Sequence, residues 1–489
     1  MSKHNHSDEV NALKVVCPRC CAWIRKPCVH TTGSKVGQPT SPHPDRIKFA
    51  RASMDISPDT KKKIRAVEEA EATEVKVKTP KDKLSSDQRR VVDLILDKIY
   101  ALQKHAEFVG PVTKGPVIST FRFKPLHRTK VAHIEGMVKD ISLALGSEEL
   151  VVVKRMPGEE AVGVFVPNKE RQLITLPDTL QNVMAYMQKP TKDGHKKIPL
   201  NFGITYVGEP FVDDLTVQPH ILVGGATDSG KSTLMNCFVL SLLWACKPSE
   251  VRLCISDTKK VEFLPYYSQI PHLERPIAKD RYETMQIMDY IVRETQRRLD
   301  EFGKGLIPCR NIHEWNDKNP EHKMHFIILL IDELADIMGE AIDRTEAKIA
   351  AAKLGAIVGR SRAAGIYVIA GTQTPRASIV KGTIKANFPS HVALKVSSSI
   401  DSKVILGVKG AECLMSRGDM FFQSSARSDL LRLHAPYAEL NDLKELIKAV
   451  ILREDIEKKK AQAKLEENEE RIAIQQEGSN KPIEVRKPN

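Results

Sequence analysis

The chain has 489 residues, enough for two or three domains with their own cores, and a formal net charge of +13 at pH 7. The charge is uneven: residues 1–200 carry 35 basic and 23 acidic side chains, whereas residues 201–489 carry 40 and 39. No apolar run approaches the roughly 20 residues that a membrane span needs, and the start shows no signal-peptide pattern. We therefore exclude a membrane protein and predict a cytoplasmic protein with a polyanionic partner.

Four of the nine cysteines cluster near the start of the chain. A C-x-x-C pair followed by another Cys and a His supplies the side chains that bind tetrahedral Zn²⁺. We predict a zinc knuckle in residues 1–30, with free thiols on a disordered tail as the alternative. The zinc ligands would be Cys17, Cys20, Cys28 and His30. Residues 31–85, rich in Pro, Ser, Thr and mixed charge, predict a flexible linker, and the other five cysteines are expected to be free thiols.

Residues 86–200 are predicted to form a small α+β domain. The apolar spacing in QRRVVDLILDKIYALQKHA predicts an amphipathic helix. It is followed by a strand over GPVISTFRFKP, a helix over Ala132–Leu145, and strands in ELVVVKRMPG and AVGVFVPNKERQ around a Pro-Gly turn.

The most specific pattern in the chain lies between Pro219 and Asn236. An apolar run predicts a buried strand, two glycines flank four residues, and a helix is predicted to begin near Lys231. Glycines let consecutive backbone N–H groups point at an anion, and the helix start adds the positive end of its dipole. The predicted nucleotide-binding residues are Gly225, Ala226, Thr227, Asp228, Ser229, Gly230, Lys231 and Ser232.

This pattern predicts ATP and Mg²⁺ as the ligands. Lys231 would reach the β- and γ-phosphates, and the Ser232 hydroxyl would hold Mg²⁺. The alternative is a glycine-rich turn that matches by chance.

Two acids end a strongly apolar run further along the chain. VRLCIS predicts a strand before Asp257, a long helix follows over Arg281–Phe302, and FIILLI predicts a strand buried on both faces. At its end, Asp332 would hold Mg²⁺ and its water shell, and Glu333 would act as the general base. The alternative is that the acids merely end the strand or cap the next helix.

Two further catalytic residues are predicted in a segment whose pattern indicates a helix, a glycine turn and a strand. Arg362 precedes the strand IYVIA and would act as an arginine finger on a neighbouring subunit's γ-phosphate. The alternative is a cation that faces the helix dipole. Gln373, at the tip of the strand, would sense phosphate or water.

Residues 351–400 hold seven basic residues and no acidic one. Basic residues spaced through loops favour contact with a phosphate backbone over the reading of bases. The predicted DNA-binding residues, all expected in loops, are Arg376, Lys381, Lys385 and Lys403.

From about residue 86 to 440 the chain resembles the FtsK/SpoIIIE family of hexameric DNA translocases. The matching segments, in order, include GPVISTFRF, GEPFVDDL, PHILVGGATDSGKS, D-x-K-x-x-E, IPHL, IDELAD, RSRAAGIYVIAGTQ and RGDMFF. The resemblance implies an α/β fold with a RecA-like motor at residues 201–448, a ring-forming domain at residues 86–200, a homo-hexamer, and double-stranded DNA as the partner. Lys231, Ser232, Asp332, Glu333 and Gln373 fall on the family's nucleotide residues, and Arg362 on its arginine finger.

The chain also departs from the family pattern. Asp228 stands in a part of the loop that commonly contains glycine, Thr374 replaces a basic residue, and so does Ser399. These differences imply a looser grip on nucleotide and DNA. We expect no membrane anchor and no C-terminal winged-helix module, only a charged helical tail at residues 449–489.

The sequence as a whole favours an ATP-driven, ring-forming translocase of double-stranded DNA. One alternative is a secretion or conjugation ATPase that moves protein or nucleoprotein. Another is a slow, nucleotide-gated DNA-binding scaffold for partition, which the adjacent acids Asp332 and Glu333 disfavour.

Overall fold

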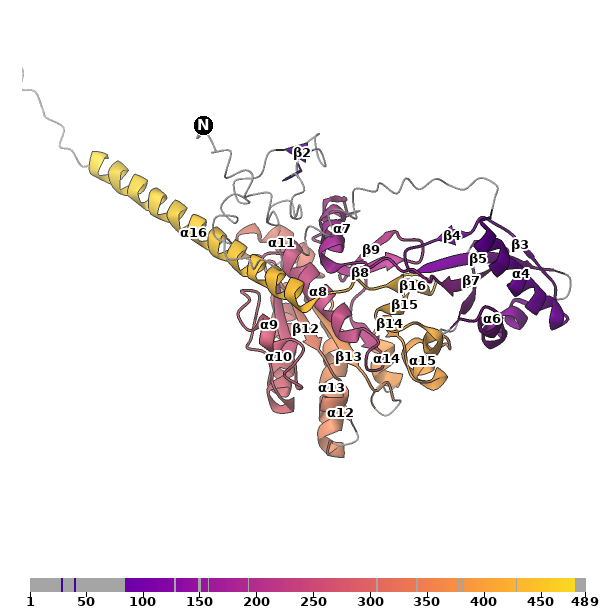
Figure 1. Cartoon of the computed structure of the whole chain (residues 1–489). Helices are drawn as coiled ribbons and strands as arrows, with labels where there is room; N and C mark the ends of the chain where they lie inside the picture. Colours follow the sequence, from indigo (N-terminus) through magenta and orange to yellow (C-terminus); the bar gives the residue numbers. More distant parts are fainter. Residues whose placement is uncertain are drawn as a thin grey trace, which may run out of the picture.

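The computed structural model describes residues 84–479 except 127–128, 148–150, 157, 192, 305–306, 340–341, 377–378, 380–381 and 428. It also describes the backbone of two paired strands, β1 (Cys28–Val29) and β2 (Pro39–Thr40). The described residues form a small α+β unit, a larger α/β unit and a long helix that leaves the larger unit on the side away from the small one (Figure 1).

The small unit is a twisted antiparallel sheet covered by helices. Its elements are α4 (Ser86–Ala101), β3 (Ala106–Phe108), β4 (Thr113–Lys114), β5 (Ile118–Pro125), α5 (Val131–Glu135), α6 (Val138–Ala144), β6 (Val152–Arg155) and β7 (Val162–Pro167). The strand order is β3-β5-β7-β6, with β4 on β5. Helix α4 begins where it does because the Ser85 hydroxyl accepts from Gln88 N while the Gln88 side chain accepts from Ser85 N. Its apolar stripe (Val92, Ile95, Ile99) packs into the core of this unit.

The single helix predicted over Ala132–Leu145 is wrong in one respect. Two short helices occupy this segment, α5 and α6, with Gly136 and Met137 between them. Glycine is a weak helix former, and the break lets both helices turn apolar side chains, Ile134 and Ile141, into the core.

The larger unit contains the remaining elements, in which one or more helices follow each of the strands β10–β14. They are α7 (Leu176–Gln188), β8 (Pro199–Thr205), β9 (Pro210–Asp214), β10 (Ile221–Gly224), α8 (Lys231–Ala245), β11 (Val251–Ser256), α9 (Leu264–Tyr267), α10 (Arg281–Phe302), α11 (Ile312–Lys318), η1 (Pro320–His322), β12 (Phe326–Ile331), α12 (Ala335–Met338), α13 (Arg344–Arg360), β13 (Ile366–Thr372), α14 (Gly382–Asn387), β14 (Ser390–Leu394), α15 (Ser399–Leu406), η2 (Ala411–Cys413), β15 (Asp419–Ser424), β16 (Leu431–His434) and α16 (Leu440–Ser479). The predicted strand–loop–helix around Lys231 and the α/β, RecA-like fold class are confirmed.

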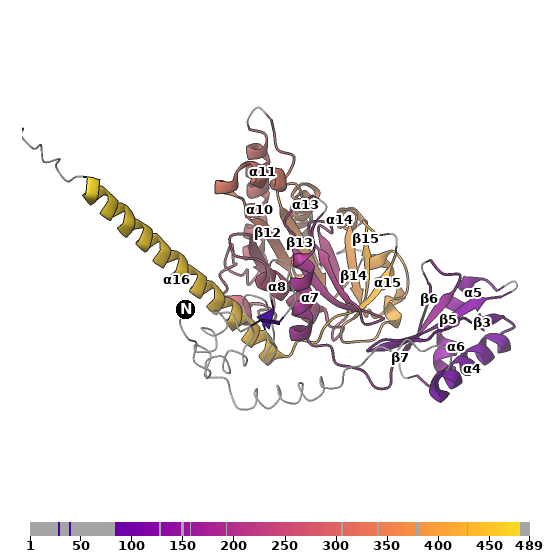
Figure 2. The ribbon, with the colours of Figure 1, turned by 90° about the horizontal axis from the view of Figure 1, so that it is seen from above.

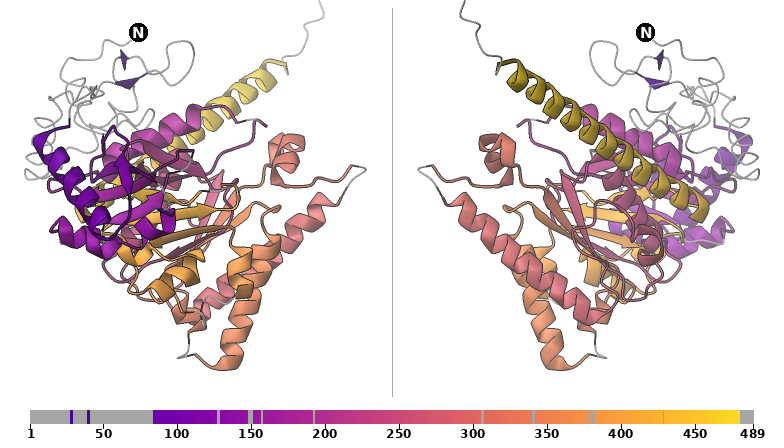
Figure 3. Two further views of the ribbon diagram at one scale, coloured as in Figure 1. Left: turned by 90° about the vertical axis from the view of Figure 1, so that its right-hand side faces the viewer. Right: turned by 90° about the vertical axis from the view of Figure 1, so that its left-hand side faces the viewer.

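In the described residues the strands of this unit form one nine-stranded sheet, in the order β11-β12-β13-β10-β14-β15-β16-β8-β9. The first five strands are parallel and the rest antiparallel. Strand β12 is buried along its whole length because helices cover both faces. Its residues alternate: Ile328 and Leu330 pack on the side of α8 and α16, and Ile327 and Leu329 on the side of α10 and α13 (Figures 2 and 3).

Two helices of the larger unit differ from the sequence prediction. Helix α7 was not predicted, and its Leu176, Leu180 and Val183 belong to the same core as β10. Helix α16 begins at Leu440, nine residues before the predicted tail at residue 449, and its first turns pack on α8 (Figure 1). None of the helices in the described ranges combines the length and apolar character that crossing a bilayer requires.

Candidate active site

The glycine-rich loop Gly225–Ser232 lies at the carboxyl edge of the parallel strands, between β10 and α8. Its start is anchored on both neighbouring strands: Gly225 N donates to Thr372 O (3.1 Å) and Ala226 N donates to Lys395 O (2.8 Å). Helix α8 begins at Lys231, so its free N–H groups and positive dipole end face the hollow of the loop. This is a backbone geometry suited to binding phosphate.

The end of the loop touches the turn that precedes β15. Gly418 N donates to Ser229 O (2.9 Å). Gly230 has φ +98°, and a Cβ atom there would lie 2.6 Å from Gly418 N. Any other residue at position 230 would therefore be strained and would push the two segments apart. Asp228, also at positive φ, is exposed.

Lys231 and Asp332 form a buried ion pair inside this loop. Lys231 Nζ lies 2.6 Å from Asp332 Oδ1 and 2.7 Å from the Asp332 backbone oxygen, and both side chains are almost fully buried. Gly371, on the adjacent strand, leaves room for the pair, since a Cβ there would lie 2.4 Å from Asp332 O. Asp332 Oδ2 is buried and accepts no hydrogen bond from the described residues, so it is available to a cation.

The D-x-K-x-x-E segment completes the other side of the site. Asp257 Oδ2 accepts from the backbone N–H groups of Glu262 (3.2 Å), Phe263 (2.9 Å) and Leu264 (2.9 Å). This turn brings Glu262 Oε1 within 2.7 Å of Ser232 Oγ. Glu262 was not predicted as a site residue, although the motif that holds it was visible in the sequence.

Glu333 lies beside Asp332, and both of its carboxylate oxygens accept hydrogen bonds. Oε1 accepts from Thr372 Oγ1 (2.9 Å) and Ala335 N (3.1 Å), and Oε2 accepts from Gln373 N (2.8 Å). Lys259 Nζ lies 3.5 Å from Oε2. Gln373 therefore reaches the site through its backbone, and Lys259 is a second residue that the sequence prediction missed.

Arg362 lies at the opposite edge of the sheet. It precedes β13, whose seven residues span about 20 Å at roughly 3.3 Å per residue, and the other end of β13 pairs with Gly224 at the loop. The side chain is exposed, and its guanidinium makes no hydrogen bond or ion pair to another residue of the described part of the chain. Burial, with a smaller contribution from the Arg362 charge, lowers the pKa of neighbouring His220 to about 4. Arg362 is therefore too far from the loop of its own chain to touch a phosphate there.

The predicted DNA-binding residues do not all lie in loops. Lys385 is in α14 and Lys403 is in α15, and Lys385 Nζ donates to Lys403 O (3.1 Å), which joins the two short helices. Burial lowers the pKa of Lys385. Arg376 is exposed just after β13, and Lys381 lies outside the described residues. The sequence prediction placed these lysines in loops because α14 and α15, with six and eight residues, are too short to show a helical period.

The predicted zinc site is not described either, apart from the backbone of Cys28 in β1. The other proposed ligands, Cys17, Cys20 and His30, lie outside the described residues. Within the described ranges, no group of three or more His, Cys, Asp and Glu side chains is arranged to hold a metal ion. The five cysteines of the larger unit are free, as predicted.

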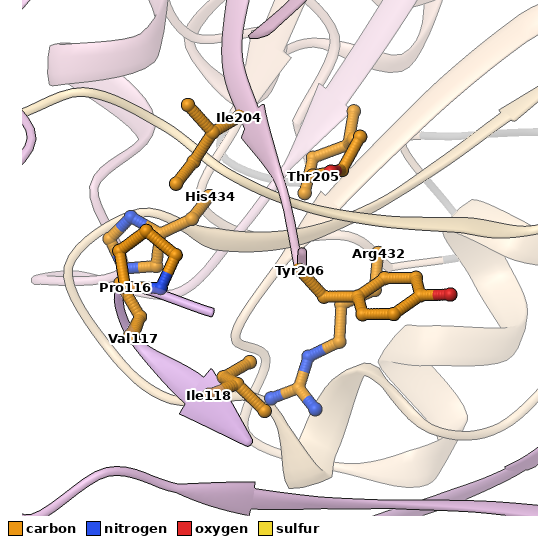
Figure 4. Close-up of a pocket in the computed structure, with 9 residues that line it drawn as sticks. Pro116, Val117, Ile118, Ile204, Thr205, Tyr206, Arg432 and His434 are labelled. Atoms are coloured by element: carbon orange, nitrogen blue, oxygen red, sulfur yellow. The ribbon is translucent and has the colours of Figure 1, made fainter. Parts of the chain in front are cut away.

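A pocket lies between the small unit and the larger one, away from this site (Figure 4). Pro116 and Ile118 line one side, and Tyr206 and Arg432 the other. The Arg432 guanidinium forms a buried bidentate pair with Asp419 (2.6 and 3.0 Å). The pocket, which lies along the contact between the two units, is also lined by Thr205 and His434.

Comparisons with known proteins agree with the resemblance. The sequence profile of the FtsK alpha domain matches residues 70–168, and that of the FtsK/SpoIIIE family matches residues 183–377. The chain is 37% identical over 336 residues to the DNA translocase FtsK of Campylobacter jejuni, covering 68% of this chain and 34% of that one. It is 32% identical over 446 residues to the FtsK of Sporosarcina ureae, covering 87% and 56%.

Among solved structures, the pCW3 conjugation coupling protein TcpA in complex with ATPγS aligns with a TM-score of 0.49 at 21% identity, covering 74% of this chain and 99% of that one. The chain spans about a third of the length of the Campylobacter relative and about 39% of the Helicobacter pylori FtsK proteins that it also matches. Two matching domains in the family's order, with identity above 30% across both, decide the assignment: the chain belongs to the FtsK/SpoIIIE family.

Proposed function

We propose that the chain is an ATP-hydrolysing, ring-forming motor that translocates double-stranded DNA. The observation that carries the proposal is the buried Lys231–Asp332 pair behind the glycine-rich loop, with Glu333 beside it. The relatives named DNA translocase support DNA as the substrate.

The loop and the first turn of α8 would bind the phosphates of ATP. Lys231 would exchange its contact with Asp332 for the β- and γ-phosphates, because a phosphate oxygen offers the same charge to its ammonium group. Ser232 and Asp332 would hold Mg²⁺, which fits the unpartnered Oδ2 of Asp332 and, when bound, neutralises phosphate charge. Glu262, on the Ser232 hydroxyl, would orient that side chain.

Hydrolysis would need residues from two chains. Glu333 would accept a proton from water as the water oxygen bonds to the γ-phosphorus and the bond to the bridging oxygen breaks, giving ADP and inorganic phosphate. Arg362 would stabilise the developing charge on the γ-phosphate of the neighbouring subunit, since it lies at the wrong edge for its own loop. Gln373 would transmit a change at the γ-phosphate to the segment that follows it. A head-to-tail contact of this kind forms a ring when its rotation closes, and we propose a homo-hexamer.

The duplex would be held by basic residues on the segments that follow β13 and β14. Arg376, Lys385 and Lys403 are partly or fully exposed on the segments after β13 and β14, and Lys381 is proposed as a fourth contact. Zinc binding by Cys17, Cys20, Cys28 and His30 and a cytoplasmic location stay predictions.

Triplex displacement tests this proposal. Wild-type protein with ATP should strip a third strand from linear duplex DNA, and Lys231→Ala, which loses ATP binding, should not. A protein-moving or nucleoprotein-moving ATPase would hydrolyse ATP without stimulation by naked duplex. A slow partition scaffold would bind duplex without displacing the third strand, and either result would reject the translocase.

A further inference from the structure

The carboxylate of Glu333 is held by three hydrogen-bond donors and one lysine of its own chain. Thr372 Oγ1, Ala335 N and Gln373 N donate to it at 2.8–3.1 Å, and Lys259 Nζ lies 3.5 Å away. Only 4% of the Glu333 side chain is exposed. A general base must present an oxygen to the attacking water. In this arrangement both oxygens already accept hydrogen bonds from the chain itself, so less of the carboxylate is left for the attacking water.

Two of these donors belong to the tip of β13, which continues into the proposed DNA contact. The Thr372 hydroxyl donates to Glu333 and also accepts from Thr374 N (3.1 Å). Arg376 N in turn donates to Thr374 O (2.8 Å). Only two residues lie between Gln373, whose N–H binds Glu333, and Arg376, the side chain proposed to meet phosphate. A shift of Arg376 would therefore reach the carboxylate over a short stretch of backbone.

We propose that the contacts of Thr372, Gln373 and Lys259 with Glu333 restrain the general base, and we call this set of contacts the latch. Thr372 and Lys259 are positioning residues that hold Glu333 away from water, and duplex DNA engaging Arg376 shifts the tip and frees the carboxylate. The latch rests on the proposed function, because it presumes that Glu333 is the base and that DNA is the partner. It explains how the grip on DNA would be coupled to hydrolysis in the same subunit.

Removing one latch donor should raise the ATPase rate without DNA. The hydrogen bond of a hydroxyl to a carboxylate is strong enough to shift the balance between held and free Glu333 by about tenfold. Thr372→Val should therefore raise the basal rate by about that factor and leave the DNA-stimulated rate unchanged, so that the stimulation ratio falls equally. Thr372→Ser, which keeps the hydroxyl, should behave like the wild type.

Lys259 gives a second test at a partly exposed position, where a substitution should not disturb folding. Its side chain is 35% exposed, so Lys259→Met should fold, and it should raise the basal rate while Lys259→Arg should not. ADP and ATPγS affinities should stay at wild-type values in both, because neither change touches the phosphate loop. Folding is checked by the melting temperature of each variant.

The outcomes separate the latch from the proposed function. Wild-type protein without ATPase activity, or without stimulation by duplex, would reject the proposed function itself. With wild-type stimulation intact, an unchanged basal rate in Thr372→Val and Lys259→Met would overturn the latch. Equal loss of the basal and stimulated rates would also overturn it, since the contacts would then align Glu333 for catalysis. A selective loss of ATPγS affinity in Lys259→Met would place that lysine on phosphate and not on the latch.

Discussion

The two edges of the central parallel sheet differ in whether their charged side chains have ion-pair partners. At the carboxyl edge the charged groups are paired with one another: Lys231 and Asp332 are both buried, and the buried Glu333 pairs with the partly exposed Lys259. At the amino edge, Arg362 is exposed and has no ion-pair partner within the described residues. A buried charge needs a partner in its own chain, whereas an exposed cation can take one from another molecule. This difference fits the proposal that each chain presents one half of a shared site at each edge of its sheet.

Loss of Arg362 should have the largest effect if Arg362 of one chain meets the phosphate loop of the next. Arg362→Ala should lower kcat for ATP by roughly 10³–10⁵, the usual contribution of an arginine finger. ATP affinity should change little, because the loop of each subunit is intact. Steady-state ATPase rates and nucleotide binding by fluorescence would measure both quantities.

A mixture of variants shows whether the edges belong to different chains. Lys231→Ala and Arg362→Ala subunits are each expected to be inactive, but together they form interfaces that join an intact loop to an intact arginine. Partial recovery of turnover supports a site between subunits. Full activity of wild-type monomer at high dilution, or no recovery in the mixture, would place the whole site within one chain.

The carboxyl edge alone is tested by Glu333→Gln, which should lower kcat by about 10²–10⁴, the range expected for a general base. ATP binding should persist, since the amide keeps the side chain's shape and the phosphate loop is unchanged. Asp300→Asn on α10, which changes an acid far from the loop, is a matched control and should retain wild-type turnover. Hydrolysis by Glu333→Gln at the wild-type rate would show that another group activates water.

The basic residues on the segments after β13 and β14 should show a smaller effect. Each phosphate contact contributes about −0.9 to the slope of log K against log salt, so Lys385→Gln with Lys403→Gln should flatten the slope for duplex binding by about 1.8. Basal hydrolysis should stay, and Lys304→Gln, just after the end of α10, should leave the slope unchanged. If deletion of residues 1–84 removes the salt-dependent binding and the lysine changes do not, the DNA contact lies in the N-terminal segment.

The smallest effect is expected at the far end of α8, which points from the carboxyl edge back toward the amino edge. Arg453 of α16 donates to Leu243 O (2.7 Å) and Trp244 O (2.9 Å) in the last turn of α8, where a cation also meets the negative end of the helix dipole. Arg453→Ala should cost about 1 kcal/mol and lower the Tm by about 2–4 °C. Lys448→Ala, an exposed change on the same helix, should leave the Tm nearly unchanged. An equal drop in both would mean that any change on α16 loosens the unit.

The sequence by itself determined the elements whose signals are local. The apolar run FIILLI, the two acids after it and the glycine spacing before Lys231 each depend on neighbouring residues, so strand β12, the loop and the start of α8 followed from pattern alone. The long helix Arg281–Phe302 was predicted with its observed bounds for the same reason.

Only the tertiary structure decided which residues meet. Glu262 reaches Ser232 from 30 positions away through the turn on Asp257, and Thr372 reaches Glu333 from 39 positions away. Such contacts depend on strand order, which places β13 between β10 and β12, and no local period encodes that order. The same order puts Arg362 about 20 Å from its own loop, since parallel strands start at one edge and end at the other.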